Sequence, residues 1–365
     1  MLRTSDDTAQ LPDRCAAWAR RIGAEVEVIG PLGLRDLRTR MGFGPYAGAV
    51  LELPRVMDDD ALATAIARAE FPVVAVSRGE LTGERSIVEA VCATALSGRG
   101  TSGFLWALWH LHALHEHPPR TLSYGDHPTH LGDLRVPDGA DHAAIVALIH
   151  GGFWRHEWQR DLMDGLALDL TRRGYATWNV EYRRVGPTGG GWPHTGDDVV
   201  RAATSLAILA DRGIDLDRLV LLGHSAGAQL ALRAAVDLRE RPRPPALVVA
   251  MSGMLDLRTA VRQGVGWGSV EAFLGADPDE EPARYRDAAP ITSVPLGVPQ
   301  LLVHGTADEH VPYAQSETYR ERATAAGDPV ELVPLQEADH FGVIDPLSEA
   351  WATTAAALER HVPAS

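Results

Sequence analysis

The stretch Leu219-Val220-Leu221-Leu222-Gly223-His224-Ser225-Ala226-Gly227 decides the fold. Four apolar residues lead directly into a Gly-x-Ser-x-Gly motif, which predicts a buried strand that turns sharply into a helix. Glycines two residues before and after Ser225 allow the strand and the helix to approach closely. Because such a turn lifts the hydroxyl above the edge of a sheet, we predict that Ser225 is a nucleophile.

A nucleophilic serine needs an acid and a histidine later in the chain, and the sequence supplies both. Asp308 follows the apolar run 301–304, and His340 follows the last predicted strand. We therefore predict a triad in which His340 takes the proton of Ser225 while Asp308 orients the imidazole ring. The acids that compete with Asp308 for this role are Glu309, Asp339 and Asp345.

His150-Gly151-Gly152 follows an apolar run, 144–149, that we expect to be the third strand of the main sheet. Glycines at this place let backbone N–H groups point into a cleft without a side chain in the way. We predict that an N–H of Gly151 or Gly152, together with that of Ala226, forms an oxyanion hole. His150 is expected to brace this loop.

Aromatic residues in the loops beside these strand ends predict an apolar or aromatic substrate pocket. Trp154 is expected to be its main wall, and His310 is expected to line the pocket or lie on the surface. The predicted substrate-binding residues are Phe153, Trp154, Trp192 and His224, with Trp267 and Phe273 added from a cap segment. His224 is also expected to be buried behind the serine.

Apolar runs alternate with helical patterns from residue 119 to the end, which predicts an α/β fold with a mostly parallel sheet and helices on both faces. Residues 256–294 are expected to form a short, irregular cap. Strands are predicted at 121–124, 131–136, 144–149, 176–181, 219–222, 246–251, 300–304 and 330–334. Helices are predicted at 158–172, 198–210 and 348–361, directly after Ser225, and between the last two strands.

Residues 1–118 are expected to form a small α/β accessory domain, and 119–365 the main domain. Strands are predicted at 24–29, 47–53 and 72–76, with helices at 34–41 and 61–70. The segment Gly98–Gly103 matches Gly-x-Gly-x-x-Gly, but a dinucleotide site needs a strand before this motif. We predict a helix over 86–96 instead, which argues against such a site. A lid, an oligomerisation surface and a degenerate enzyme domain remain open as roles for this domain.

Residues from about 121 to 365 resemble an α/β-hydrolase of the esterase type. His150-Gly151-Gly152-Phe153-Trp154, Glu181-Tyr182-Arg183 and His304–Pro312 resemble the arylformamidase (kynurenine formamidase-like) group and the small feruloyl/acetyl-xylan esterase-like group. The chain departs from the hormone-sensitive-lipase pattern, because Phe153 replaces a third glycine and His224 replaces an aspartate.

The resemblance implies a serine hydrolase that cleaves a small or aromatic carboxylic ester through an acyl-enzyme. An arylformamidase or aryl-amide hydrolase with the same triad is the alternative. A peptidase, an acyltransferase and a non-catalytic binding module are further alternatives.

Composition and charge exclude several other functions. The net charge of −15 argues against nucleic acid or an anionic membrane as a partner. All 34 basic residues are arginine, so lysine-dependent chemistry is excluded. Cys15 and Cys92 lack metal-ligand spacing, and we expect no metal or cofactor. With no leader or membrane span evident, we expect a cytoplasmic enzyme that acts on a small molecule; a homodimer is left open.

Overall fold

The computed structural model describes residues 49–52, 56–57, 73–77, 82–83, 94–97, 99, 102–209 and 213–365. The chain divides into two compact units, Met1–Pro118 and Pro119–Ser365. Within the described part, no helix combines the length and the apolar character needed to cross a membrane.

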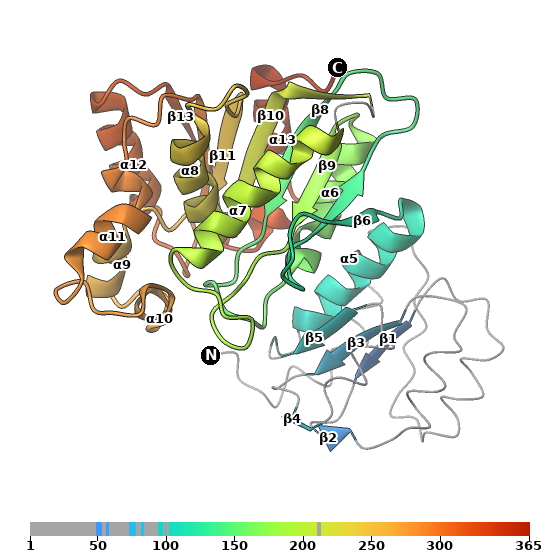
Figure 1. The fold of residues 1–365 in the computed structure, drawn as a ribbon, viewed down its shortest axis with the longest axis horizontal. Coiled ribbons are helices and arrows are strands. Elements are labelled where there is room, and N and C mark those ends of the chain that lie inside the picture. The colour runs from blue at the N-terminus through green and yellow to red at the C-terminus, as the bar shows by residue number, and fades with distance from the viewer. Residues whose placement is uncertain are drawn as a thin grey trace. The chain divides into compact units, whose positions relative to one another are not determined.

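An eight-stranded sheet forms the centre of the second unit (Figure 1). The strands lie in the order β13-β12-β11-β10-β8-β9-β7-β6, and β7 alone runs antiparallel to its neighbours. The mostly parallel sheet that the sequence predicts is therefore confirmed. The strand bounds are β6 (Arg120–Ser123), β7 (Leu131–Arg135), β8 (Ala143–Ile149), β9 (Ala176–Val180), β10 (Ile214–His224), β11 (Leu247–Met251), β12 (Gln300–Gly305) and β13 (Val330–Leu335).

The central strands are continuous apolar runs because both faces of the sheet are covered. Every residue of β8, β9, β11 and β12 is buried. In register, Gly223 of β10 lies beside Ile149 of β8, and His224 lies beside Met251 of β11. The carboxyl ends of these three strands therefore meet at one edge, where the following loops carry the predicted site residues.

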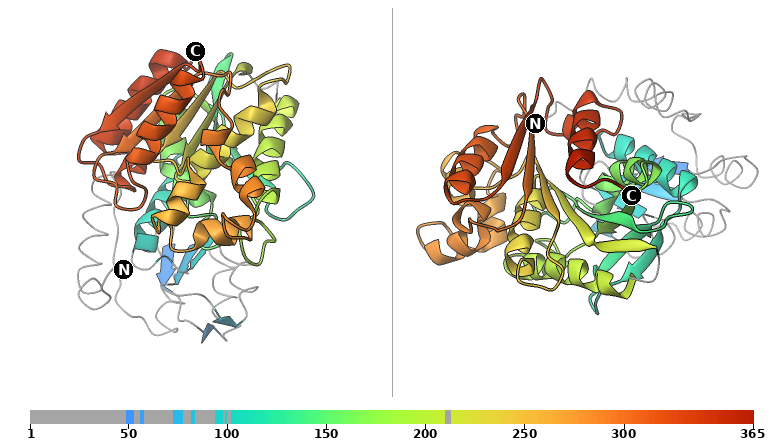
Figure 2. Two further views of the ribbon diagram at one scale, coloured as in Figure 1. Left: turned by 90° about the vertical axis from the view of Figure 1, so that its left-hand side faces the viewer. Right: turned by 90° about the horizontal axis from the view of Figure 1, so that it is seen from above.

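Helices cover both faces of the sheet (Figure 2). On one face α7 packs against α8, and on the other the Trp351 Nε1 of α13 donates a 2.6 Å hydrogen bond to Asp169 of α6. The bounds are α6 (Asp164–Arg172), α7 (His194–Ser205), α8 (Ala226–Leu238), α12 (Ala314–Ala325) and α13 (Glu349–His361). The first turn of the helix predicted at 158–172 is a separate 3₁₀ segment, Arg160–Met163, and α7 begins four residues before the predicted Asp198.

The cap segment is helical, so the prediction that it is irregular is wrong. It contains α9 (Leu257–Arg262), α10 (Ser269–Leu274) and α11 (Pro282–Ala288), followed by a 3₁₀ turn at Pro290–Thr292. Each helix has only six or seven residues, too few for a 3.6-residue apolar pattern to stand out in the sequence.

The first unit contains a parallel three-stranded sheet of β1 (Ala49–Glu52), β3 (Val73–Ser77) and β5 (Thr94–Ser97). β2 (Val56–Met57) pairs with β4 (Thr82–Gly83), and α5 spans Ser102–Glu116. The strands predicted at 47–53 and 72–76 are confirmed by β1 and β3. The predicted elements at 24–29, 34–41 and 61–70, and both cysteines, lie outside the described residues.

Residues 86–93 of the helix predicted over 86–96 lie outside the described residues. The prediction is wrong for residues 94–96, which belong to β5, the strand next to β3 in the small sheet. Gly-x-Gly-x-x-Gly therefore does lie between a strand and a helix, contrary to the reason given for setting it aside. A dinucleotide site also needs an acidic residue later in the same βαβ unit. Asp126, the residue at about that spacing, belongs to the second unit and not to the unit that contains the motif.

Candidate active site

Ser225 occupies a strained turn between β10 and α8. Its φ of 55° and ψ of −117° are uncommon for a residue with a side chain. A Cβ on Gly223 would lie 2.1 Å from the Gly227 carbonyl oxygen, and one on Gly227 would lie 2.1 Å from that of Ile149. Only glycine fits at these two positions. The Ser225 side chain is buried, and its Oγ makes no hydrogen bond to any residue described.

Asp308 and His340 are joined directly, although 32 residues separate them. The His340 Nδ1 donates to the Asp308 Oδ2 over 2.7 Å, while the other carboxylate oxygen accepts the backbone N–H groups of His310 and Val311. Burial alone would raise the pKa of Asp308, but hydrogen bonds from His304 and His340 hold it well below its usual range. The carboxylate is therefore ionised, and the Nε2 of His340 is left to accept a proton.

His224 links the serine turn to the loop that carries His340. Its Nε2 donates to the His340 backbone oxygen over 2.9 Å, and the two ring centroids are 4.6 Å apart. Burial, and then the neighbouring His340, lower the pKa of His224 well below 6.5, so the ring is neutral. His224 is buried, as expected from its place in the motif.

The loop after β8 packs against the serine. A Cβ on Gly151 would lie 3.0 Å from the Ser225 Cβ, and one on Gly152 would lie 2.2 Å from Trp158. The backbone N–H groups of Gly151, Gly152 and Ala226 have no hydrogen-bond acceptor within the described part of the chain. Unsatisfied donors thus lie on both of the elements that flank Ser225, as an oxyanion hole requires.

His150 braces this loop from behind, as the sequence predicts. Its ring is buried; Nδ1 lies 2.8 Å from the Gly151 carbonyl oxygen, and Nε2 lies 3.0 Å from the Glu181 carboxylate. The Tyr182 hydroxyl donates to the His150 backbone oxygen over 2.6 Å, and the two rings stack with centroids 4.2 Å apart. No role was predicted for Glu181, although it stands directly after β9, next to the end of β8.

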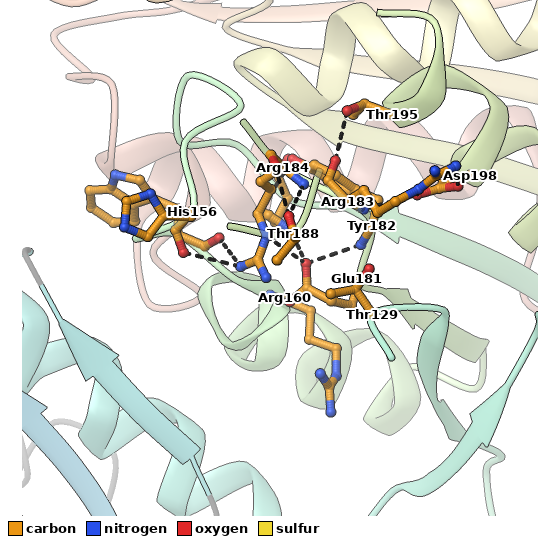
Figure 3. Close-up of polar contacts among 12 residues, drawn as sticks. Thr129, His156, Arg160, Glu181, Tyr182, Arg183, Arg184, Thr188, Thr195 and Asp198 are labelled. Carbon is orange, nitrogen blue, oxygen red and sulfur yellow. Dashed lines mark hydrogen bonds and ion pairs between the residues drawn. The ribbon is translucent and has the colours of Figure 1, made fainter. Parts of the chain in front are cut away.

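Glu181 is the centre of a polar network at this strand end (Figure 3). Its carboxylate accepts the backbone N–H groups of Tyr182 at 3.0 Å and Arg160 at 3.2 Å, and lies 3.4 Å from the Arg184 guanidinium. Burial by itself would raise the pKa of Glu181, but Arg184 and His150 outweigh it and lower the pKa from 4.5 to about 2. The carboxylate is therefore charged throughout the neutral range.

The Glu181 carboxylate should make the stability of the fold depend on pH. Because its pKa is lower in the folded chain than in the unfolded chain, its contribution is complete above about pH 4.5 and is lost as the pH falls towards 2. A shift of this size corresponds to roughly 3 kcal/mol. Chemical denaturation at a series of pH values should show wild type more stable than Glu181→Gln at neutral pH, with a difference that narrows on acidification. A difference that does not change with pH would contradict this.

Trp154 does not form the wall of an open pocket, contrary to its expected role. Its ring is completely buried, stacks on Phe273 at 4.3 Å, and donates through Nε1 to Gln229. Trp192 faces a separate cavity of about 250 Å³, where its indole N–H donates to Asp287 and Arg233 lies over its ring. None of Ser225, Asp308 and His340 lines that cavity.

A different set of rings surrounds His340. The His310 ring stacks on that of His340 with centroids 5.0 Å apart. The ring centroid of Trp267 lies 6.1 Å from that of His310 and 5.8 Å from that of Phe153, so Trp267 connects the surroundings of His340 to the loop after β8. Phe341 contacts His340 at 5.4 Å. We call Phe153, Trp267, His310 and Phe341 the aromatic rim.

Trp267 stands out in the aromatic rim because 67% of its surface is exposed. Its φ of 48° lies in the left-handed region, between two glycines that also have positive φ. Strained backbone of this kind is concentrated at functional sites, and Phe153 and Ser225 share it.

Arg183, which is partly exposed, and the buried Asp198 form a separate ion pair beside this network. The guanidinium lies 2.7 Å from the Asp198 carboxylate, which also lies 2.9 Å from the ring of His130. Among the described residues, no group of three or more His, Cys, Asp or Glu side chains could hold a metal ion.

Comparisons with known proteins identify the family of the chain. The BD-FAE family model matches residues 133–322. Esterase LipC of Mycobacterium tuberculosis is 25% identical over 66% of this chain and 63% of its own length, so the chain spans less than two thirds of that relative. Kynurenine formamidase of Danio rerio is 25% identical over 62% of this chain and 75% of its own.

Solved structures show the same fold. A truncated carbohydrate esterase from gut microbiota superimposes with a TM-score of 0.60 at 19% identity, over 66% of this chain and 95% of the other. The sheet and its helices are those of the α/β-hydrolase fold, as the resemblance implied.

Proposed function

The chain belongs to the BD-FAE family, and from this membership we propose that it is a serine hydrolase that cleaves a carboxylic ester through an acyl-enzyme on Ser225. The observation that carries the proposal is the 2.7 Å hydrogen bond between His340 and Asp308, on loops beside a serine held in a strained turn. The hydrogen bond from His224 to the His340 backbone supports it, because this bond connects the loop that carries His340 to the turn that carries Ser225.

Acylation follows from these groups. The Ser225 Oγ attacks the carbonyl carbon of the ester while its proton passes to the His340 Nε2. The resulting oxyanion accepts hydrogen bonds from the N–H groups of Gly152 and Ala226. Asp308 stabilises the imidazolium and keeps the ring in the required tautomer. When the C–O bond of the ester breaks, His340 returns the proton to the departing alcohol.

Deacylation repeats these steps with water. The His340 Nε2 takes a proton from water as its oxygen attacks the acyl carbon, and the same N–H groups hold the second oxyanion. Breaking the bond to Ser225 releases the acid and returns the proton to the serine. Since all of these groups belong to residues 119–365, we also propose that residues 1–118 form an accessory unit.

An aryl-formamide hydrolase with the same triad is the second candidate. The similarity to a kynurenine formamidase favours it, whereas the esterases among the relatives and solved structures favour the ester. Turnover of p-nitrophenyl acetate and N-formyl-kynurenine should be measured side by side on the full chain. We expect a higher kcat/KM for the ester. A higher value for the formamide would replace the first proposal with the second.

We expect the Trp267 ring to contact the aromatic ring of an aryl ester substrate. Replacing it with alanine is expected to raise KM for p-nitrophenyl acetate about fivefold, since one aromatic contact contributes around 1 kcal/mol. The KM for ethyl acetate, which has no ring, should change little. Steady-state kinetics of both substrates provide the test.

Trp267→Phe is the matched control, because it keeps an aromatic ring at this position. It should retain most of the affinity for the aryl ester. An equal rise in KM for both esters in Trp267→Ala would mean that the side chain supports the loop rather than the substrate.

A further inference from the structure

The ring of His150 faces a hydrogen-bond acceptor at each of its nitrogens. Nδ1 lies 2.8 Å from the Gly151 carbonyl oxygen, which can only accept. The Tyr182 hydroxyl lies 3.2 Å from the same nitrogen, but its one proton is donated to the His150 backbone oxygen at 2.6 Å. Nε2 lies 3.0 Å from the Glu181 carboxylate. A neutral imidazole has one N–H and one lone pair, so it could satisfy only one of these contacts unless Glu181 carried the proton.

The surroundings of Glu181 exclude that alternative. The carboxylate oxygen nearest His150 also accepts the backbone N–H of Tyr182 and lies 3.4 Å from the Arg184 guanidinium, while the other oxygen accepts the N–H of Arg160. A protonated carboxyl would give up a charge-assisted contact with Arg184. The lowered pKa of Glu181 agrees with the ionised form.

Tyr182 adds a third favourable contact. Its ring lies parallel to that of His150, at 4.2 Å between centroids, which suits a cation over an aromatic face. Burial, and then the charge of Glu181, raise the pKa of Tyr182 well above 10, so the phenol stays neutral. Two arginines, Arg184 and Arg160, also act on the Glu181 carboxylate, and Arg184 lies 3.4 Å from it.

We propose that Glu181 holds His150 as a buried imidazolium, and that this cation strengthens the Gly152 N–H as a donor to the oxyanion. The Gly151 oxygen and the Gly152 N–H belong to the same peptide group. A charged donor on the oxygen draws electrons from the peptide, and this makes its N–H a better donor. His150, Glu181 and Tyr182 are then positioning residues that act through the backbone. This inference rests on the proposed function for the oxyanion role, but not for the charge of His150.

The charge can be measured without any assay of activity. In the full chain labelled with ¹⁵N-histidine, an imidazolium gives two ring N–H signals, whereas a neutral ring gives one. The His150→Asn variant assigns them among the 15 histidines of the chain. If that variant does not fold, Tyr182→Phe identifies the same signals by shifting them, because it removes only a hydroxyl. Two signals from His150 are expected, and a single one would overturn the proposal.

The effect on catalysis is tested by Glu181→Gln, which keeps an acceptor oxygen but removes the charge. We expect kcat for p-nitrophenyl acetate to fall about tenfold with little change in KM, because the lost stabilisation concerns only the oxyanion. One of the two His150 N–H signals should disappear in the same variant.

Asp198→Asn is the matched control, since Asp198 is also a buried carboxylate paired with a buried histidine, His130, but makes no contact with Gly151. Its kcat should stay near that of wild type even if its thermal stability falls. An equal loss of kcat in both variants would overturn the link to the oxyanion. If Ser225→Ala kept its turnover, the proposed function would fail, while the two N–H signals would still establish the charge of His150.

Discussion

Replacing Ser225 with alanine is expected to lower kcat for p-nitrophenyl acetate by about 10⁴- to 10⁶-fold. Without the hydroxyl there is no acyl-enzyme, and the only remaining route is direct attack by water on a carbonyl that the oxyanion donors still polarise. The fold should persist, because the Oγ makes no hydrogen bond among the described residues and alanine removes only that atom. Single-turnover kinetics would show whether a burst of p-nitrophenol disappears with the hydroxyl.

Ser252 offers a matched control for this experiment. It directly follows the neighbouring strand β11, is fully buried, has a positive φ of 48°, and its Oγ also makes no hydrogen bond among the described residues. Ser252→Ala removes an equivalent hydroxyl from an equivalent environment, and it should keep kcat near that of wild type. Loss of turnover in Ser252→Ala, with turnover retained in Ser225→Ala, would show that Ser225 is not the nucleophile and would point to Ser252 instead.

The second large effect is expected for Asp308→Asn, which should lower kcat about 10⁴-fold. An asparagine can donate from its amide to the Nδ1 of His340, and this would favour the tautomer whose Nε2 already carries a proton. That ring cannot act as a base. The amide also removes the negative charge that stabilises the imidazolium. The loss should appear in kcat and kcat/KM alike, which steady-state kinetics can resolve.

Glu309→Gln and Asp339→Asn separate the acid from its neighbours. Glu309 is adjacent to Asp308 in sequence, and the Asp339 carboxylate accepts the backbone N–H groups of Phe341 and Gly342 within its own turn. Both variants should keep kcat within about tenfold of wild type, the size of effect expected from a slight displacement of the base. If either lost as much as Asp308→Asn, the acid would have to be reassigned.

The order of apolar runs was enough to predict where Ser225, Asp308 and His340 lie. Parallel strands covered on both faces read as uninterrupted apolar stretches, so their ends are visible in the sequence, and chemical groups just beyond those ends must share one edge. The runs did not decide among Asp308, Glu309, Asp339 and Asp345; in the structure it is Asp308 that hydrogen-bonds to His340.

Trp154 shows why the pocket was harder to predict than the strand ends. It follows Phe153, and both have positive φ, so the chain turns at consecutive residues and sends one ring to the aromatic rim and the other into the core. Nothing in the order of residues indicates such a turn. Glu181 was missed for another reason: its role depends on β9 lying beside β8, which is a property of the sheet order.

The hydrogen bond from His224 to the backbone of His340 has a consequence for how precisely the site is built. Ser225 follows β10 and His340 follows β13, with β11 and β12 between the two strands. Were the sheet the only connection, small displacements at each of the three strand pairings would add up in the distance from Ser225 to His340. A direct bond from the residue before the serine bypasses all three. The sheet can therefore flex, or accept substitutions that alter its twist, without this error accumulating at the reacting atoms.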